Sequence, residues 1–279
     1  MRMRAALAVG KNGLLAGVAA FQFLTRLPIP INLTYTDEVF RRSVVFYPLI
    51  GAVLGLLLAL AGWGLQLLLP LWPATVLLLA LWVALTGGLH LDGLMDAADG
   101  LLSHRPREQM LEIMKDSRVG AMGVMVCVLH LLFKAALLST LPLAGGNAGL
   151  AAGALLAVIP LWSRWFMIIA ICRWPYARSG SGLGGLFRGV RARHALAGTV
   201  LALVLGCGAL WLAREAFAAV IPLPFAAVLA LMPLVTAFVG WVLAAGVHRK
   251  LGGLTGDIYG ALNELLEAVL LLVAVGLLA

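Results

Sequence analysis

The chain has 279 residues, of which 63% are hydrophobic and 11% are charged, and its mean hydropathy is +1.04. A chain this apolar cannot cover its core with polar surface, which excludes a water-soluble globular protein and indicates one integral-membrane domain over residues 1–279. The net charge of +8 does not indicate a nucleic-acid partner, because no basic segment with interleaved aromatic residues accompanies it.

The first 24 residues superficially resemble a signal peptide, since Arg2, Arg4 and Lys11 precede a modest apolar run. The run leads directly into residues 21–30 without a clean small-residue cleavage site before a soluble domain. We therefore expect this segment to be retained as an interfacial or re-entrant element.

Seven apolar runs have the length that crosses a bilayer as a helix, about 20 residues for roughly 30 Å of hydrocarbon. They are residues 44–69, 73–90, 120–141, 150–171, 195–213, 225–247 and 260–279. The sequence therefore predicts an all-α fold, a polytopic helical bundle with about seven transmembrane helices. Within the first run, Gly51 and Gly55 would let a second helix approach closely.

The Lys and Arg residues gather on one side of these predicted spans. Of the 20, 17 fall before the first span or in residues 91–119, 172–194 and 248–259. Lys134 and Arg164 fall within spans, and only Arg214 falls on the opposite side. The positive-inside rule places the charged side in the cytoplasm and the C-terminus outside.

An aspartate-rich segment follows the second run. Asp92, Asp96 and Asp99 are spaced i, i+4 and i+7, so they share one face of a helix that continues from residues 73–90. A single carboxylate at a span end can simply face water, but three on one face, with Asp116 downstream, favour a functional site. Their mutual repulsion predicts a divalent metal, and hard oxygen ligands suit Mg²⁺ or Mn²⁺.

Other polar residues lie on the same predicted side. His90 is a general base, a hydrogen-bond orienter or a passive interfacial residue. Lys115, Ser117 and Arg118 surround Asp116 and suit an anion held beside a metal. A solvated helix face explains the two glutamates that precede them, Glu108 and Glu112.

Two later segments return to this side. Arg178 stands in the Gly- and Ser-rich residues 175–185, which suit a loop over a phosphorylated ligand or an ordinary flexible loop. Asp257, Glu264 and Glu267 fall at i, i+7 and i+10 near the last span, and Asn263 stands beside them. They predict a second acidic stripe, or hydrogen bonds between helices. Two acidic stripes with Lys and Arg between them suit phosphotransfer on a metal-bridged phosphoanhydride.

Four motifs resemble the cobalamin synthase family: residues 23–28 (FLTRLP), 87–100 (GGLHLDGLMDAADG), 114–120 (MKDSRVG) and 252–257 (GGLTGD). The resemblance runs in order from about Phe21 to Glu267. It implies a multi-pass enzyme of late vitamin B12 biosynthesis in a prokaryotic cytoplasmic (inner) membrane, and the placement of Lys and Arg puts its active site on the cytoplasmic side. The implied reaction joins adenosylcobinamide-GDP and α-ribazole, or its 5'-phosphate, to give adenosylcobalamin, or its 5'-phosphate, and GMP, with Mg²⁺.

The resemblance also implies roles for individual residues. Metal and diphosphate binding are carried to Asp92, Asp96, Asp99 and Asp116. A ribose hydroxyl would attack the phosphorus on the cobinamide side, and one carboxylate of the cluster or His90 would accept its proton. Substrate binding is assigned to Thr25, Arg26, Lys115, Ser117, Arg118, Arg178, Asp257, Asn263 and Glu264.

Two other functions fit parts of the pattern. Carboxylates inside a membrane also mark cation- or proton-coupled transporters, but these carboxylates gather at span ends and no internal repeat accompanies them. The CDP-alcohol phosphotransferases place aspartates around metals in a similar way, but their aspartate spacing is not matched here. Besides the lipid bilayer and the substrates, a homo-oligomer or an association with other late cobalamin enzymes is a possible partner.

Overall fold

The computed structural model describes residues 2–178, 187 and 189–279, with side chains from residue 13 onward. Across these ranges the regular structure is helical, and the single β contact is an isolated bridge between Tyr176 and Leu254. The helices are α1 (Arg2–Leu24), α2 (Asp37–Ser43), α3 (Tyr47–Leu68), α4 (Leu71–Thr86), α5 (Leu89–Leu101), α6 (Arg107–Ile113), α7 (Ala121–Ser139), α8 (Gly146–Arg173), α10 (Ala192–Leu212), α11 (Arg214–Val220), α12 (Phe225–Leu251) and α13 (Gly256–Leu278). A short 3-10 turn, Val44–Phe46, joins α2 to α3.

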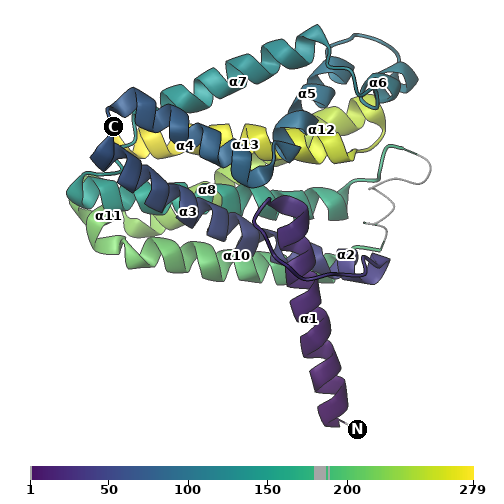
Figure 1. Ribbon diagram of the computed structural model, residues 1–279, viewed down its shortest axis with the longest axis horizontal. Helices are drawn as coiled ribbons and strands as arrows, with labels where there is room; N and C mark the ends of the chain where they lie inside the picture. The colour runs from purple at the N-terminus through teal and green to yellow at the C-terminus, as the bar shows by residue number, and fades with distance from the viewer. Residues whose placement is uncertain (1, 179–186, 188) are drawn as a thin grey trace.

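The long helices lie side by side in one bundle (Figure 1). Among the described residues, six helical segments are long and apolar enough to cross a membrane, and the pair α4 and α5 raises the number to seven if it counts as one span. This confirms the predicted all-α polytopic bundle. The predicted spans correspond to α3, α4, α7, α8, α10, α12 and α13.

The second predicted span, residues 73–90, is wrong at its end. α4 stops at Thr86, and α5 leaves at an angle of 88°. Gly87 and Gly88 make the break with φ values of +64° and +70°, a left-handed conformation that glycine adopts without a Cβ clash. The aspartates therefore stand on a separate helix and not on a continuation of the second span.

α8 is the central helix, with 78% of its most apolar stretch buried inside the bundle. Its closest neighbour is α3, because Gly51 and Gly55 face its backbone. A Cβ atom at either position would overlap the carbonyl oxygens of Pro160 or Ala157. The close approach predicted for these two glycines is therefore confirmed.

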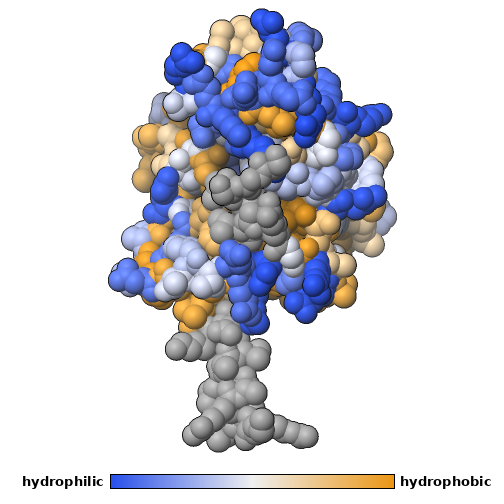
Figure 2. Space-filling model, turned by 90° about the vertical axis from the view of Figure 1, so that its right-hand side faces the viewer, coloured by the Kyte–Doolittle hydropathy of each residue, from blue (hydrophilic) through white to orange (hydrophobic). Residues whose placement is uncertain are grey.

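The charged connections gather at one end of the bundle, on the right in Figure 1, where residues 102–120, 174–178 and 252–255 lie. Figure 2 views this end, where hydrophilic side chains are prominent. The connections predicted to carry the charge thus lie together at one end of the bundle. α1 lies across the direction of the long helices, and its described apolar part, Gly13–Leu24, is shorter than a span. Its role as an interfacial or re-entrant element stays a prediction.

Candidate active site

The crossing of α5 and α13 brings acidic residues from two distant parts of the chain together. A Cβ atom on Gly93 would lie 2.8 Å from the carbonyl oxygen of Asp257, and one on Gly260 would lie 3.1 Å from that of His90. Only glycine lets the two backbones pass this closely. Asp257 stands in the first turn of α13, where a carboxylate is favoured by the helix dipole.

A cleft of about 150 Å³ opens at this crossing. Its polar lining comes from His90, Asp92 and Asp257, and its walls are apolar and aromatic, including Phe23 and Tyr259. We call it the acid-rich cleft. Carboxylates beside aromatic walls suit a ligand that has both a charged group and a flat ring.

Negative charge at this crossing exceeds positive charge. Asp96 is half-buried, and the carboxylates of Asp92, Asp257 and Asp99 all repel its charge, while the guanidinium of Arg178 partly offsets this repulsion. Arg178 donates to Asp257 Oδ2 over 2.7 Å and to the Met114 carbonyl oxygen over 3.3 Å. The gathering of carboxylates around Asp96 favours binding of a cation.

The backbone around Arg178 is fixed by contacts with the loop before α13. The Ala177 amide donates to the Leu254 carbonyl over 2.8 Å. Arg107 holds both segments, because its guanidinium donates to the carbonyls of Leu251 and Ala177 over 2.7 and 2.9 Å. Residues 175–178 are thus an ordered part of the site. The remainder of the predicted loop, residues 179–185, lies outside the described residues.

Two of the predicted metal ligands have other partners. Both oxygens of Asp99 accept backbone amides at the start of α7, from Gly120 and Gly123, over 2.8 Å each. Asp116 lies on an exposed loop and pairs with Arg118 over 2.6 Å. Hydrogen bonds from Arg118 lower the pKa of Asp116 to about 2. Metal binding by Asp99 and Asp116 stays a prediction.

The donors that remain free suit a hard cation. Asp92 and Asp96 offer only carboxylate oxygens, the ligands that Mg²⁺ prefers. Within the described residues, no three His, Cys, Asp or Glu side chains are close enough together to hold a metal alone. A metal there would therefore need oxygens from a bound substrate or water, as is common for Mg²⁺.

The residues of the FLTRLP motif support the break between α4 and α5. The Thr25 hydroxyl is buried and donates to the Phe21 carbonyl over 2.8 Å. The Arg26 amide donates to the Leu85 carbonyl over 2.8 Å, and its side chain packs against Gly87. Lys115 and Ser117 are exposed on the loop before α7. Substrate binding by these four residues stays a prediction.

The predicted second acidic stripe is wrong as a single surface, because its members lie in two environments. Seven residues of helix separate Asp257 from Glu264, roughly 10 Å along the axis. Glu264 and Glu267 are buried, with exposed fractions of 5% and 0%. Asn263 is buried with them and donates to Glu267 over 3.2 Å. None of these three lines the acid-rich cleft.

Glu264 and Glu267 belong instead to a buried ion network with His130, Lys134 and Arg164. Lys134 Nζ contacts both glutamates, at 3.0 and 2.8 Å. His130 Nε2 lies 2.9 Å from Glu264, and Arg164 pairs with Glu267. Two cations thus neutralise two carboxylates in the interior of the bundle, where α7, α8 and α13 meet.

His90 stands between the network and the cleft. Its ring is 1% exposed, and its Nδ1 lies 3.4 Å from Nη2 of Arg164. Its Nε2 has no hydrogen-bond partner within the described part of the chain, although His90 lines the cleft. An unpaired buried nitrogen is costly, which indicates that this atom serves a ligand.

Sequence reasoning left His130, Lys134, Arg164 and Arg107 without a role. A signal existed for two of them. Lys134 and Arg164 are cations inside predicted spans, and the last span contains two glutamates that could neutralise them. No local pattern marked Arg107, whose contacts form only in the folded chain.

The fold and the cleft together define a polytopic helical membrane protein with an acid-rich, partly aromatic site at its charged end. A family model described as Cobalamin-5-phosphate synthase matches residues 16–275, so the chain belongs to that family. This confirms the resemblance found in the four motifs.

Curated relatives support the same assignment. The chain is 43% identical over 268 residues to the adenosylcobinamide-GDP ribazoletransferase of Desulfitobacterium hafniense, covering 93% of this chain and 96% of the relative. It is 40% identical over 261 residues to the enzyme of that name from Brevibacillus brevis, covering 92% and 96%. The Pseudomonas aeruginosa enzyme is 40% identical over 255 residues, covering 91% and 95%. No solved structure matches the chain.

Proposed function

We propose that this chain is an adenosylcobinamide-GDP ribazoletransferase that joins adenosylcobinamide-GDP to α-ribazole, or to its 5'-phosphate, and releases GMP. The observation that carries the proposal is the glycine-mediated crossing of α5 and α13. It brings His90, Asp92, Asp96 and Asp257 together with Arg178. The relatives' shared name supplies the substrates.

In this proposal Asp92 and Asp96 hold Mg²⁺, which when bound would neutralise the charge of the diphosphate. Arg178 supplies a guanidinium to the phosphate oxygens, and Asp257 fixes its direction through the 2.7 Å contact. Arg178 therefore binds and orients the phosphate, while the aromatic walls of the cleft exclude water from it.

The neighbours of His90 suggest its role. A guanidinium only donates hydrogen bonds, so Nδ1 of His90 accepts from Arg164 and the neutral ring carries its proton on Nε2. His90 would then donate a hydrogen bond into the cleft and orient an oxygen of the substrate. The proton of the attacking ribose hydroxyl is left to the carboxylate of Asp92 or Asp96.

We place the cleft on the cytoplasmic side of a prokaryotic cytoplasmic membrane. In the sequence, 17 of the 20 Lys and Arg fall in the segments predicted on one side of the spans, which the positive-inside rule assigns to the cytoplasm. A nucleotide-activated substrate made in the cytoplasm would reach the cleft there without crossing the bilayer.

The test is turnover by the purified full chain in liposomes supplied with adenosylcobinamide-GDP, α-ribazole and Mg²⁺. Release of GMP together with the joined corrinoid is expected, and chelation of Mg²⁺ should stop both. α-Ribazole 5'-phosphate should be compared in a parallel reaction to identify the preferred acceptor. No product with either acceptor from folded protein would contradict the proposal.

A further inference from the structure

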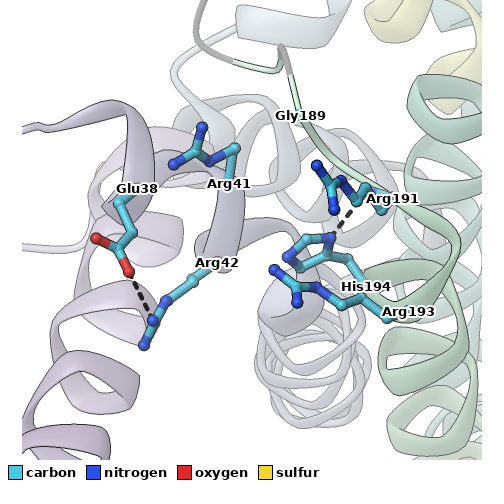
Figure 3. Close-up of a pocket in the computed structure, with 7 residues that line it drawn as sticks. All are labelled: Glu38, Arg41, Arg42, Gly189, Arg191, Arg193 and His194. Carbon is cyan, nitrogen blue, oxygen red and sulfur yellow. Dashed lines mark hydrogen bonds and ion pairs between the residues drawn. The ribbon is translucent and has the colours of Figure 1, made fainter.

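A second polar pocket, separate in its lining from the acid-rich cleft, lies between α2 and the start of α10. Its volume is about 220 Å³, and it is lined by Glu38, Arg41, Arg42, Gly189, Arg191, Arg193 and His194. Figure 3 shows these side chains around a common space, with α2 on one side and α10 on the other. We call it the arginine pocket.

The arginine pocket has a surplus of positive charge. Glu38 is its one carboxylate and pairs with Arg42 over 2.6 Å. Arg41, Arg191 and Arg193 have no carboxylate partner within the described residues, and residues 179–186 and 188 contain no acidic residue in the sequence. Three guanidinium groups gathered without a counter-charge favour an anion with several oxygens.

The pocket is built by specific backbone features. Gly189 has a φ of +91°, and a Cβ atom there would lie 3.0 Å from Cδ of Arg41. The positive φ favours glycine at this position, where the backbone passes close to the Arg41 side chain. His194 is 8% exposed, and its Nδ1 accepts the Arg191 amide over 2.9 Å. Its Nε2 thus carries the proton of the neutral ring and faces the pocket as a further donor (Figure 3).

The surface that continues from the pocket is apolar. Leu196, Val200 and Val204 follow Arg193 at helical spacing on α10 and are 67%, 54% and 65% exposed. In a bilayer, such a stripe lies against acyl chains. A phosphate in the pocket would therefore stand at one end of an exposed apolar stripe, which suits a phospholipid with acyl chains better than a free ion.

We propose that the arginine pocket binds the phosphate of an anionic phospholipid headgroup, with the acyl chains along Leu196, Val200 and Val204. Basic pockets at the ends of membrane helices commonly hold such headgroups. The site would fix the position of α2 and α10 relative to the membrane surface. This proposal does not depend on the transferase activity.

The test uses the full chain in nanodiscs of phosphatidylcholine mixed with phosphatidylglycerol, followed by gentle extraction and quantification of retained lipids by native mass spectrometry. The wild type should retain phosphatidylglycerol in preference to phosphatidylcholine. The triple variant Arg41→Gln, Arg191→Gln, Arg193→Gln should retain at least about tenfold less phosphatidylglycerol than the wild type. The single variant R193Q, at an exposed position, should show a smaller loss and guards against misfolding of the triple variant.

A matched control removes the same charge elsewhere at the charged end, with Arg105→Gln, Arg249→Gln and Lys250→Gln, and should retain phosphatidylglycerol as the wild type does. Equal retention of the two lipids by the wild type, or unchanged retention in R193Q and the triple variant, would overturn the proposal. Displacement of the lipid by millimolar inorganic phosphate would assign the pocket to a free phosphate instead and also overturn it.

Discussion

The acid-rich cleft and the buried ion network are built from the same kinds of side chain but in opposite electrostatic conditions. In the network, Lys134 and Arg164 neutralise Glu264 and Glu267, and all four are nearly inaccessible. Beside the cleft, the carboxylates of Asp92, Asp99 and Asp257 repel the charge of Asp96, and Arg178 only partly offsets this repulsion. Balanced charges inside a membrane protein hold helices together, whereas unbalanced charges at an accessible cleft need a ligand.

The two regions meet at His90, whose Nδ1 contacts Arg164 while its Nε2 is left without a partner. The network therefore contacts a side chain of the cleft through Arg164. This division of roles yields predictions that separate loss of activity from loss of stability.

The largest expected effect is on turnover, when the charge is removed from Asp92, which lines the acid-rich cleft, or from Asp96, one helical turn further along α5. Asp92→Asn and Asp96→Asn each delete a charged oxygen ligand, so we expect kcat to fall by at least about 100-fold. The thermal midpoint in detergent should stay near that of the wild type, because the change relieves repulsion. Asp37→Asn, on an exposed turn of α2, is the matched control. Near-normal turnover in D92N and D96N would remove these residues from the site.

Removing a network carboxylate should instead destabilise the fold. Glu267→Gln leaves the charges of Lys134 and Arg164 without their shared partner, and breaking a buried pair in this way costs about 3 kcal/mol. Reversible unfolding in mixed micelles measures it. The double variant Glu267→Gln, Lys134→Gln removes one charge of each sign and should recover part of the loss. If the free energy of unfolding of the double variant is instead lower than that of E267Q, by as much as breaking a second buried pair would cost, charge balance is not what stabilises the network.

A smaller effect is expected from His90. His90→Ala removes one hydrogen-bond donor from the cleft and should lower kcat/KM roughly tenfold. His90→Gln places an amide N–H near the position of Nε2 and should recover most of the activity. The pH profile of kcat/KM should keep its shape in H90Q. Loss of its acidic limb in H90Q, with activity as low as in H90A, would make His90 the general base.

The smallest effect is expected from Asp116. Arg118 lowers its pKa to about 2, so the carboxylate keeps its charge as the pH falls below the ordinary aspartate value of 3.8 and loses it only near 2. Because the pair is exposed and Asp116 already has Arg118 as its partner, we expect Asp116→Asn to lower kcat by less than about tenfold. A fall in kcat as large as that in D92N would indicate that Asp116 is a metal ligand after all.

Much of the fold could be predicted from the sequence. The length of each apolar run follows from the thickness of the bilayer, and the placement of Lys and Arg follows from the cost of moving charged side chains across it. The exception is the break at Gly87 and Gly88. Two glycines inside an apolar run permit a bend but do not require one. In the folded chain the Arg26 side chain packs against Gly87 at the bend, a contact between residues far apart in the chain that periodicity does not reveal.

The candidate site was predictable in composition but not in grouping. The spacing of Asp92, Asp96 and Asp99 placed them on one helix, as the structure has them. Periodicity alone could not tell which neighbour each would meet, and Asp99 turned out to accept two amides of α7. Likewise, helical periodicity predicted that Asp257 and Glu264 lie on one face of α13. They do not share a site, because Asp257 lines the cleft while Glu264 is buried inside the bundle.

The most direct test of the central claim is divalent-cation binding, measured by the electron paramagnetic resonance signal of Mn²⁺ titrated into the detergent-solubilised full chain with adenosylcobinamide-GDP present. We predict saturable Mn²⁺ binding that Mg²⁺ displaces and that D92N and D96N abolish, while D116N and the double variant Glu267→Gln, Lys134→Gln retain it. Saturable binding that persists unchanged in D92N and D96N, or that disappears in the folded double variant, would contradict the claim that the unbalanced cleft is the cation site.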